Sequence, residues 1–365
     1  MESRGRMIAR GFLIPRMEAP TLRPVISSDA RRLAELARAA GFGESPDEAL
    51  EWNREALSLL ADGDESPLLA DVLRWQGSVF RERGRTSEAE PLYYRSYELS
   101  VRIGYDAGTA HALNCLASLA QRRGDIRTAA NLASDALVIA GRIGERRLIG
   151  MLQQNLGLLA DIRGNPAAAL AHYSVSLRTF ESSNDLEPMC WLLNNLGALH
   201  VKEARFEEAE SVFRRALGIS RARGDLMCEG VVEENRAELE LVRGAIDEAY
   251  DPLTRALEIA DRRGDSLRRA AALKLRGAYQ RLCGRPAEAA ETLRYALTLS
   301  AVSEDALLGA EVLYQFGLAL HDDGQETSAR EAWQAAMEAF ERIAARQWVG
   351  RVRKRLSSGV TGRYL

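Results

Sequence analysis

Long apolar runs, aromatic residues and cysteines are all scarce in this chain of 365 residues. No run approaches the length of a membrane span, and the N-terminal arginines are not followed by the long apolar core of a secretory signal. The four cysteines are Cys115, Cys190, Cys228 and Cys283, and none forms a C-x-x-C pair. We therefore expect no disulfide framework, a cytoplasmic location, and a role for Cys283 as a small buried filler.

The signatures of catalysis and of nucleic-acid binding are missing as well. The histidines, His111, His172, His200 and His321, lack the spacing of metal ligands, and His200 is expected to be a satisfied core residue. The sequence contains no P-loop, dinucleotide fingerprint or nucleophile elbow. The formal net charge of −3 gives no reason to expect nucleic acid or an anionic membrane as a partner. The sequence thus predicts a protein that is not an enzyme and needs no cofactor or metal.

What the chain does contain is self-similarity at a step of forty residues. Three series keep this step without slipping by one residue, and each holds glycine or alanine in every unit. They begin at Gly77, Gly84 and Ala89 and continue to Gly317, Gly324 and Ala329. Such a register indicates one structural unit stacked many times.

The small residues have steric explanations. Two antiparallel helices approach closely where facing side chains are small, which assigns the Gly77 and Ala89 series to the two helices of a hairpin. The Gly84 series lies between them, at the turn, where glycine accepts a positive φ. A further series, Gly104, Gly144, Asn184, Gly224 and Gly264, marks the end of the second helix.

These residues resemble the tetratricopeptide repeat, which the segment 191–220, "WLLNNLGALHVKEARFEEAESVFRRALGIS", matches throughout. The forty-residue unit is similar to those of kinesin light chain, the adaptor LGN and the bacterial Rap and NprR peptide receptors. The resemblance implies an all-α, right-handed α-solenoid of about eight helical hairpins with a C-terminal capping helix. We expect an N-terminal arm at 1–28, a solenoid at 29–343, a capping helix at 344–358 and a flexible tail at 359–365. The repeats are expected near 29–61, 70–104, 110–144, 150–184, 190–224, 230–264, 270–304 and 310–343.

In tetratricopeptide arrays the first helix of each hairpin lines a concave groove. We number the positions along each first helix as slots, with the Gly77 series at slot eight. Slots two, five, six and nine are then expected to face that groove, and slots twelve and thirteen are further candidates. We call this surface the A-face. Asparagine is a poor helix former, yet it recurs at slots five and six of four consecutive repeats, where a carboxamide can donate to and accept from a peptide group. The resemblance to kinesin light chain and the Rap-type receptors implies that these asparagines hold a peptide backbone. We expect two tryptophans to flank them, because an exposed tryptophan in a groove can anchor a ligand. The predicted peptide-binding residues are Arg74, Trp75, Asn114, Gln154, Asn155, Trp191, Asn194, Asn195, Glu234, Asn235 and Lys274. The alternative is that the asparagines cap carbonyls or face water and that the tryptophans pack between repeats.

Three functions remain compatible with the sequence. The first is a protein-interaction module that binds an extended peptide or partner segment in the groove through the asparagine ladder. The second is a regulatory peptide sensor that controls a separate effector or transcription factor, and the third is a scaffold that self-assembles. The arm at 1–28, which is apolar and broken by prolines, is also a candidate for self-interaction with the solenoid.

Overall fold

The computed structural model describes residues 29, 32, 35, 36, 46–60, 65–302, 305–343 and 345–358. The predicted arm at 1–28 and tail at 359–365 lie outside the described residues. Within these residues every regular element is a helix, which confirms the predicted all-α solenoid.

The helices alternate between the two arms of successive hairpins. The first helices, which carry the A-face, are α4 (Pro67–Glu82), α6 (Asp106–Arg122), α8 (Arg146–Ile162), α10 (Leu186–Lys202), α12 (Leu226–Arg243), α14 (Ser266–Leu282) and α16 (Ala306–Asp322). The second helices are α5 (Thr86–Arg102), α7 (Ile126–Ile143), α9 (Pro166–Ser183), α11 (Phe206–Arg223), α13 (Tyr250–Arg262), α15 (Pro286–Val302) and α17 (Glu326–Arg342). A 3₁₀ turn, η1 (Asp247–Ala249), precedes α13, and α3 (Pro46–Leu59) and α18 (Arg346–Ser358) stand at the two ends.

The turns between helices adopt the left-handed backbone that the glycine series predicts. The glycines of both turn series have positive φ, between 60° and 85°. Two positions of these series hold another residue in place of glycine: Asn184 and Ala204, with φ of 50° and 55°. Alanine bears a steric cost there that glycine does not, so the position of Ala204 is fixed by the surrounding hairpin rather than by local preference.

Within a hairpin, the glycine of the first helix makes room for an aromatic ring of the second. A Cβ atom added at Gly157 would lie 2.5 Å from Cε1 of Tyr173, and one added at Gly77 would lie 2.7 Å from Cε1 of Tyr93. In the last hairpin the buried ring is Trp333, whose indole nitrogen donates to the carbonyl of Tyr314 at 3.3 Å. Trp333 is thus a core residue.

This packing makes Gly157→Leu destabilising. The new side chain has no space beside Tyr173, so we expect overpacking to lower the free energy of unfolding by about 1–3 kcal/mol. The loss should extend to neighbouring repeats because a solenoid is stabilised by its interfaces. Urea unfolding measures the change. Gly218→Leu on α11 is the matched control, since nothing lies within 4 Å of a Cβ atom there. Equal losses in the two variants would contradict the packing argument.

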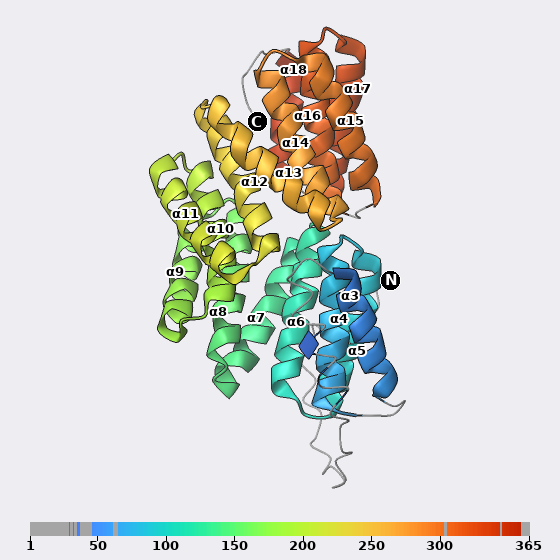
Figure 1. Ribbon diagram of the computed structural model, residues 1–365, viewed down its shortest axis with the longest axis vertical. Helices are drawn as coiled ribbons and strands as arrows, with labels where there is room; N and C mark the ends of the chain where they lie inside the picture. The colour runs from blue at the N-terminus through green and yellow to red at the C-terminus, as the bar shows by residue number, and fades with distance from the viewer. Residues whose placement is uncertain are drawn as a thin grey trace.

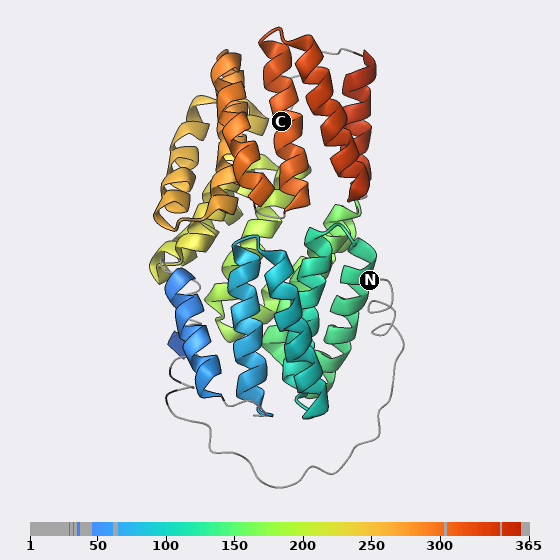
Figure 2. The ribbon, with the colours of Figure 1, turned by 90° about the vertical axis from the view of Figure 1, so that its right-hand side faces the viewer.

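The hairpins wind as a superhelix that returns on itself. Figures 1 and 2 show α4–α7 beneath α14–α18, with α8–α11 forming the link between the two levels. Arg122 at the end of α6 lies 3.4 Å from the carboxylate of Asp305, 183 residues later. A Cβ atom at Gly164 would lie 2.9 Å from Nε2 of Gln347, at the same sequence separation. A Cβ atom at Gly124 would meet the carbonyl oxygen of Ile343 at 2.5 Å. We call this contact between the turns of the early repeats and the helix starts of the late ones the seam.

The apolar core is interrupted at α12. Large clusters of buried apolar residues join α5–α8, α9–α12 and α14–α18, whereas only two small clusters join α12 to α13 and α14. Helix α12 instead buries four carboxylates. They are Glu229, Glu233, Glu234 and Glu240. Arginines of α11 and α13 pair with Glu229 and Glu233, so ion pairs between helices add to the apolar packing around α12.

Candidate functional site

The two asparagine-bearing slots differ in depth. The side chains at slot five, Asn114, Gln154, Asn194 and Glu234, are buried, while Asn155, Asn195 and Asn235 at slot six are half-buried. A carboxamide or carboxylate that is buried must find a hydrogen-bond partner, or it costs free energy. Slot six therefore exposes more of each side chain to a ligand than slot five does, and slot five also needs a partner within the protein.

The asparagines meet that need by pairing across adjacent repeats. Nδ2 of Asn155 on α8 donates to Oδ1 of Asn114 on α6 at 2.6 Å. Two repeats later, Nδ2 of Asn235 on α12 donates to Oδ1 of Asn194 on α10 at 2.8 Å. Neither sequence alternative, capping of carbonyls or contact with water alone, anticipated this pairing. In each pair the amide group of the accepting asparagine has no hydrogen bond among the described residues. The carbonyl oxygen of the donating asparagine has none there either.

A constant stagger produces both pairs. The paired asparagines are 41 residues apart, one more than the repeat length, so slot five of one helix faces slot six of the next. The same separation joins Lys202 to Asp161 at 2.6 Å and Arg281 to Asp322 at 3.0 Å, between slots twelve and thirteen. Neighbouring first helices therefore face each other with an offset of one residue over several turns.

The two tryptophans lie at the packing interfaces between helices. Trp75 is half-buried against the apolar cluster of α3 and α4, and Trp191 is half-buried against the cluster of α9–α12. Packing between helices thus explains why each ring is partly buried. Their exposed parts stay candidates for contact with a ligand.

At the N-terminal end of the A-face, a polar group surrounds Asp71. Nη2 of Arg74 lies 2.8 Å from one carboxylate oxygen of Asp71, and the Tyr105 hydroxyl donates to the other at 3.1 Å. Nε of Arg74 is buried without a hydrogen-bond partner. His111, at slot two of α6, has its pKa lowered to about 3 by burial and by the charges of Arg74 and Arg147, so it is neutral at physiological pH.

At the C-terminal end, acidic groups surround Lys274. Its Nζ lies 2.5 Å from Oε2 of Glu311, and although burial opposes the charge, Glu311, Glu238 and Glu234 raise the pKa of the lysine. Glu234 is 7% exposed, and burial raises its pKa to about 7 against the opposing charge of Arg268. Arg268 reaches Oε2 of Glu234 at 3.4 Å, which leaves Oε1 buried without a hydrogen-bond partner. An ionisable group that is short of a partner in this way is a candidate ligand contact.

One further polar group was missed by sequence reasoning. Gln315 on α16 occupies slot six, as Asn155 and Asn235 do, and it is buried with Oε1 lacking a hydrogen-bond partner. Its slot could have identified it, but glutamine does not repeat there in other units. The structure thus adds Gln315 to the candidate ligand contacts on the A-face.

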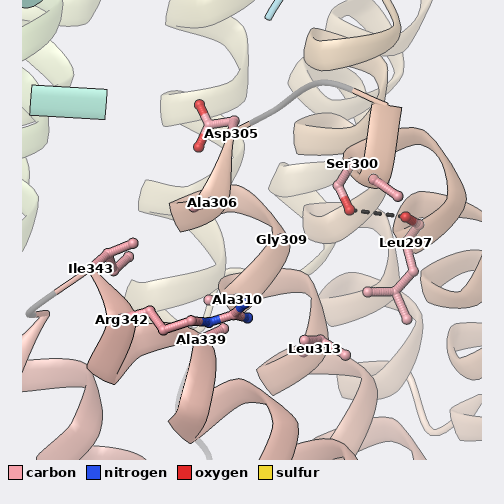
Figure 3. A pocket seen from close by; sticks show the side chains of 11 residues that line it. Leu297, Ser300, Asp305, Ala306, Gly309, Ala310, Leu313, Ala339, Arg342 and Ile343 are labelled. Atoms are coloured by element: carbon pink, nitrogen blue, oxygen red, sulfur yellow. Dashed lines mark hydrogen bonds between the residues drawn. The ribbon is translucent and has the colours of Figure 1, made fainter. Parts of the chain in front are cut away.

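A separate pocket of about 500 Å³ lies away from the predicted residues, between α15, α16 and α17 (Figure 3). Small side chains on α16, including Ala306, Gly309 and Ala310, leave this space open. Most of the other lining residues are apolar, and Asp305 and Arg342 contribute charge. Since Asp305 also pairs with Arg122, the pocket adjoins the seam.

The predictions for cysteine and His200 need correction. Cys190 and Cys228, which lie in neighbouring repeats, form a disulfide, and Cys283 is exposed rather than buried. Sequence reasoning missed the pair because the two residues occupy different slots, and the exposure of Cys283 follows from its place beside the turn at Gly284. His200 is buried as predicted, but its Nδ1 has no hydrogen-bond partner.

Two classes of site are absent from the described ranges. No group of three or more His, Cys, Asp or Glu residues there could hold a metal ion. No helix in the same ranges is long and apolar enough to cross a membrane.

Comparison with known proteins identifies the repeat and the fold. The family model described as "Tetratricopeptide repeat" matches residues 190–222, the repeat that carries Asn194 and Asn195. No curated protein matches the chain. Among solved structures, a Rap protein complexed with competence and sporulation factor superposes with a TM-score of 0.66 at 13% identity, over 87% of this chain and 99% of the other.

Two further Rap-type structures agree. The Rap conjugation gene regulator of plasmid pLS20, in complex with the Phr* peptide, has a TM-score of 0.65 at 14% identity and covers 88% of this chain and 97% of its own. Aspartyl phosphate phosphatase F from Bacillus subtilis has a TM-score of 0.58 at 12% identity, over 94% of this chain and 99% of its own. Residues 190–222 are thus a tetratricopeptide repeat, and the fold of the chain resembles that of the Rap proteins. At these identities the likeness concerns the fold alone.

Proposed function

We propose that this protein is a protein-interaction module that binds an extended peptide along the A-face, with the asparagine pairs as its main-chain contacts. The observation that carries the proposal is the pairing itself. Asn114–Asn155 and Asn194–Asn235 have the same geometry two repeats apart, and each presents a free amide donor beside a free carbonyl acceptor. That combination complements a peptide group and does not depend on the ligand's side chains.

The charges on the A-face add a preference to this main-chain binding. Oε1 of Glu234 is buried beside Asn235 and lacks a partner, so a donor on the ligand would satisfy it. Leaving such a group without a partner costs about 1–3 kcal/mol, and a ligand that supplies one recovers part of that cost. We infer that the ligand places a donor, such as a basic side chain, near α12.

A peptide library tests the proposal directly. A random octapeptide mixture is passed over the immobilised full chain, and the retained peptides are sequenced. We expect enrichment for basic residues at one position with little selection at others. Asn131→Ala, an exposed asparagine on α7, is the control for non-specific effects. Retention of no peptides above background would refute the proposal.

The regulatory alternative is favoured by one observation. The Rap structures that this chain resembles in fold are complexes with a sporulation factor and with the Phr* peptide, and the second is a gene regulator. A sensor role predicts that peptide binding changes the affinity for a second protein. Pull-down of an effector with and without the enriched peptide distinguishes a sensor from an adaptor.

The arm at 1–28 gives rise to a separate prediction. If it occupies the A-face as a self-ligand, deleting residues 1–25 should raise affinity for the library-derived peptide, because a tethered segment competes at high effective concentration. Titration calorimetry on the full and truncated chains measures this. Identical affinity, together with identical hydrogen exchange of the first helices, would assign the arm no such role.

A further inference from the structure

The disulfide joins the two helices that carry the second asparagine pair. Cys190 lies on α10, four residues before Asn194, and Cys228 lies on α12, seven residues before Asn235. These spacings are one and two helical turns, so each cysteine lies on the same side of its helix as the asparagine. The bond and the asparagine pair therefore follow one another along the contact between α10 and α12, neighbours in Figure 1.

The bond lies on the side of α12 that has the larger apolar cluster, and the two sides of this helix differ in their packing. Cys228, Val232 and Leu239 join α12 to the core cluster of α9–α11. Toward α14, only Ala237 and Leu241 of α12 enter small clusters. The covalent link thus fastens α12 to the repeat before it, while its buried apolar contacts with α13 and α14 lie in two small clusters.

The first asparagine pair has no such link. The positions equivalent to Cys190 and Cys228 beside Asn114 and Asn155 hold Ala110 and Leu148, both fully buried. Apolar packing and the Asn114–Asn155 hydrogen bond hold α6 against α8 without a covalent link. The molecule therefore contains one asparagine pair with a disulfide beside it and one without, which provides an internal control.

We propose that the Cys190–Cys228 bond is a reversible redox element that sets the rigidity of the α10–α12 half of the A-face, a role that rests on the proposed peptide binding. The reductant is a dithiol. One of its thiolates attacks one sulfur of the disulfide and releases the other as a thiol after protonation; its second thiol then displaces the protein sulfur from the mixed disulfide. Two protein thiols and one oxidised dithiol result, and the reverse reaction restores the bond. Disulfides in reducing compartments are commonly of this transient kind.

Burial makes the exchange depend on local opening. Cys190 is 1% exposed and Cys228 is fully buried, so a reductant reaches the bond only when α12 separates from α10. A peptide that spans both helices would oppose this opening. Ligand binding and resistance to reduction are thus linked.

The first measurement counts thiols and follows hydrogen exchange. The full chain is equilibrated with mixtures of oxidised and reduced dithiothreitol and alkylated after denaturation. We expect two labelled cysteines, Cys115 and Cys283, under oxidising conditions and all four under reducing conditions. Reduction should speed amide exchange of α12 roughly tenfold or more and leave α6 and α8 unchanged. Four labelled cysteines under every condition would overturn the proposal. So would an amide exchange rate in α12 that is the same for oxidised and reduced protein.

The second measurement uses the random octapeptide mixture with oxidised and reduced protein. We expect the oxidised form to retain several times more peptide, and the variant Cys190→Ala/Cys228→Ala to behave as the reduced form under both conditions. If that variant fails to fold, reduced wild-type protein replaces it. Equal retention by the two redox states would overturn the switch and leave peptide binding intact. Retention by neither state would refute peptide binding and the regulatory role together.

Discussion

Replacing both members of an asparagine pair by alanine is expected to weaken peptide binding by about 1–3 kcal/mol, which is roughly 5- to 150-fold in Kd. The estimate assumes two carboxamide–peptide hydrogen bonds per pair, each contributing about 0.5–1.5 kcal/mol net. The two double variants are Asn114→Ala/Asn155→Ala and Asn194→Ala/Asn235→Ala. If a ligand spans both pairs, the combined variant should lose about the sum.

The double substitutions are chosen to spare the fold. Removing Asn155 alone would leave Oδ1 of Asn114 buried without a donor, at a cost of about 1–3 kcal/mol, whereas removing both partners avoids this. Alanine also favours helix over asparagine. Thermal unfolding should therefore be nearly unchanged, and titration calorimetry with a library-derived peptide reports binding. A double variant that binds as tightly as Asn131→Ala would exclude that pair from the site.

Glu234→Gln should stabilise the protein at pH 8 and have little effect near pH 5. The pKa of Glu234 is raised to about 7 in the folded state, while in the unfolded chain it is close to 4.5. Between these values the folded state binds a proton that the unfolded state does not, so stability falls as pH rises from about 4.5 to 7 and is then constant. The accumulated loss is roughly 3 kcal/mol, and a glutamine does not incur it.

Urea unfolding of both proteins at pH 5 and pH 8 measures this difference. Glu238→Gln, one turn further along α12 and half-buried, controls for the general loss of a carboxylate from the A-face. A difference between wild type and Glu234→Gln that is the same at both pH values would show that Glu234 is ionised throughout. A basic ligand that meets Oε1 should bind more tightly at pH 8 than at pH 5, since the carboxylate must lose its proton to pair with it.

The local fold was predictable because each feature repeats every forty residues. The glycine and alanine series gave the turns and the close contacts within hairpins, and the ring of Tyr173 lies over Gly157 as that reading requires. The sequence also predicts which slots form the A-face, but it does not give the depth of each slot. Whether slot five is covered depends on the stagger between neighbouring first helices, and that stagger appears in the sequence only as pairs 41 residues apart.

Features that join distant or unlike positions were not predictable. The disulfide links residues 38 apart, which matches neither the repeat nor the stagger. The contact of Arg122 with Asp305 depends on the rotation of each repeat relative to the last, and small rotations accumulate over several units. The sequence of a single repeat does not give this accumulated rotation, so it does not predict the contact.

The seam limits how this chain can change in length. An open solenoid tolerates the gain or loss of a unit, because each repeat contacts only its neighbours. Here Arg122 and Gly164 meet Asp305 and Gln347 only if the intervening number of repeats is kept. A duplicated or deleted forty-residue unit would rotate the late helices away from the early turns and expose both sides of the contact. The seam therefore ties the number of intervening repeats to the closed superhelix, and we expect this fold to tolerate changes of length at its ends better than in its middle.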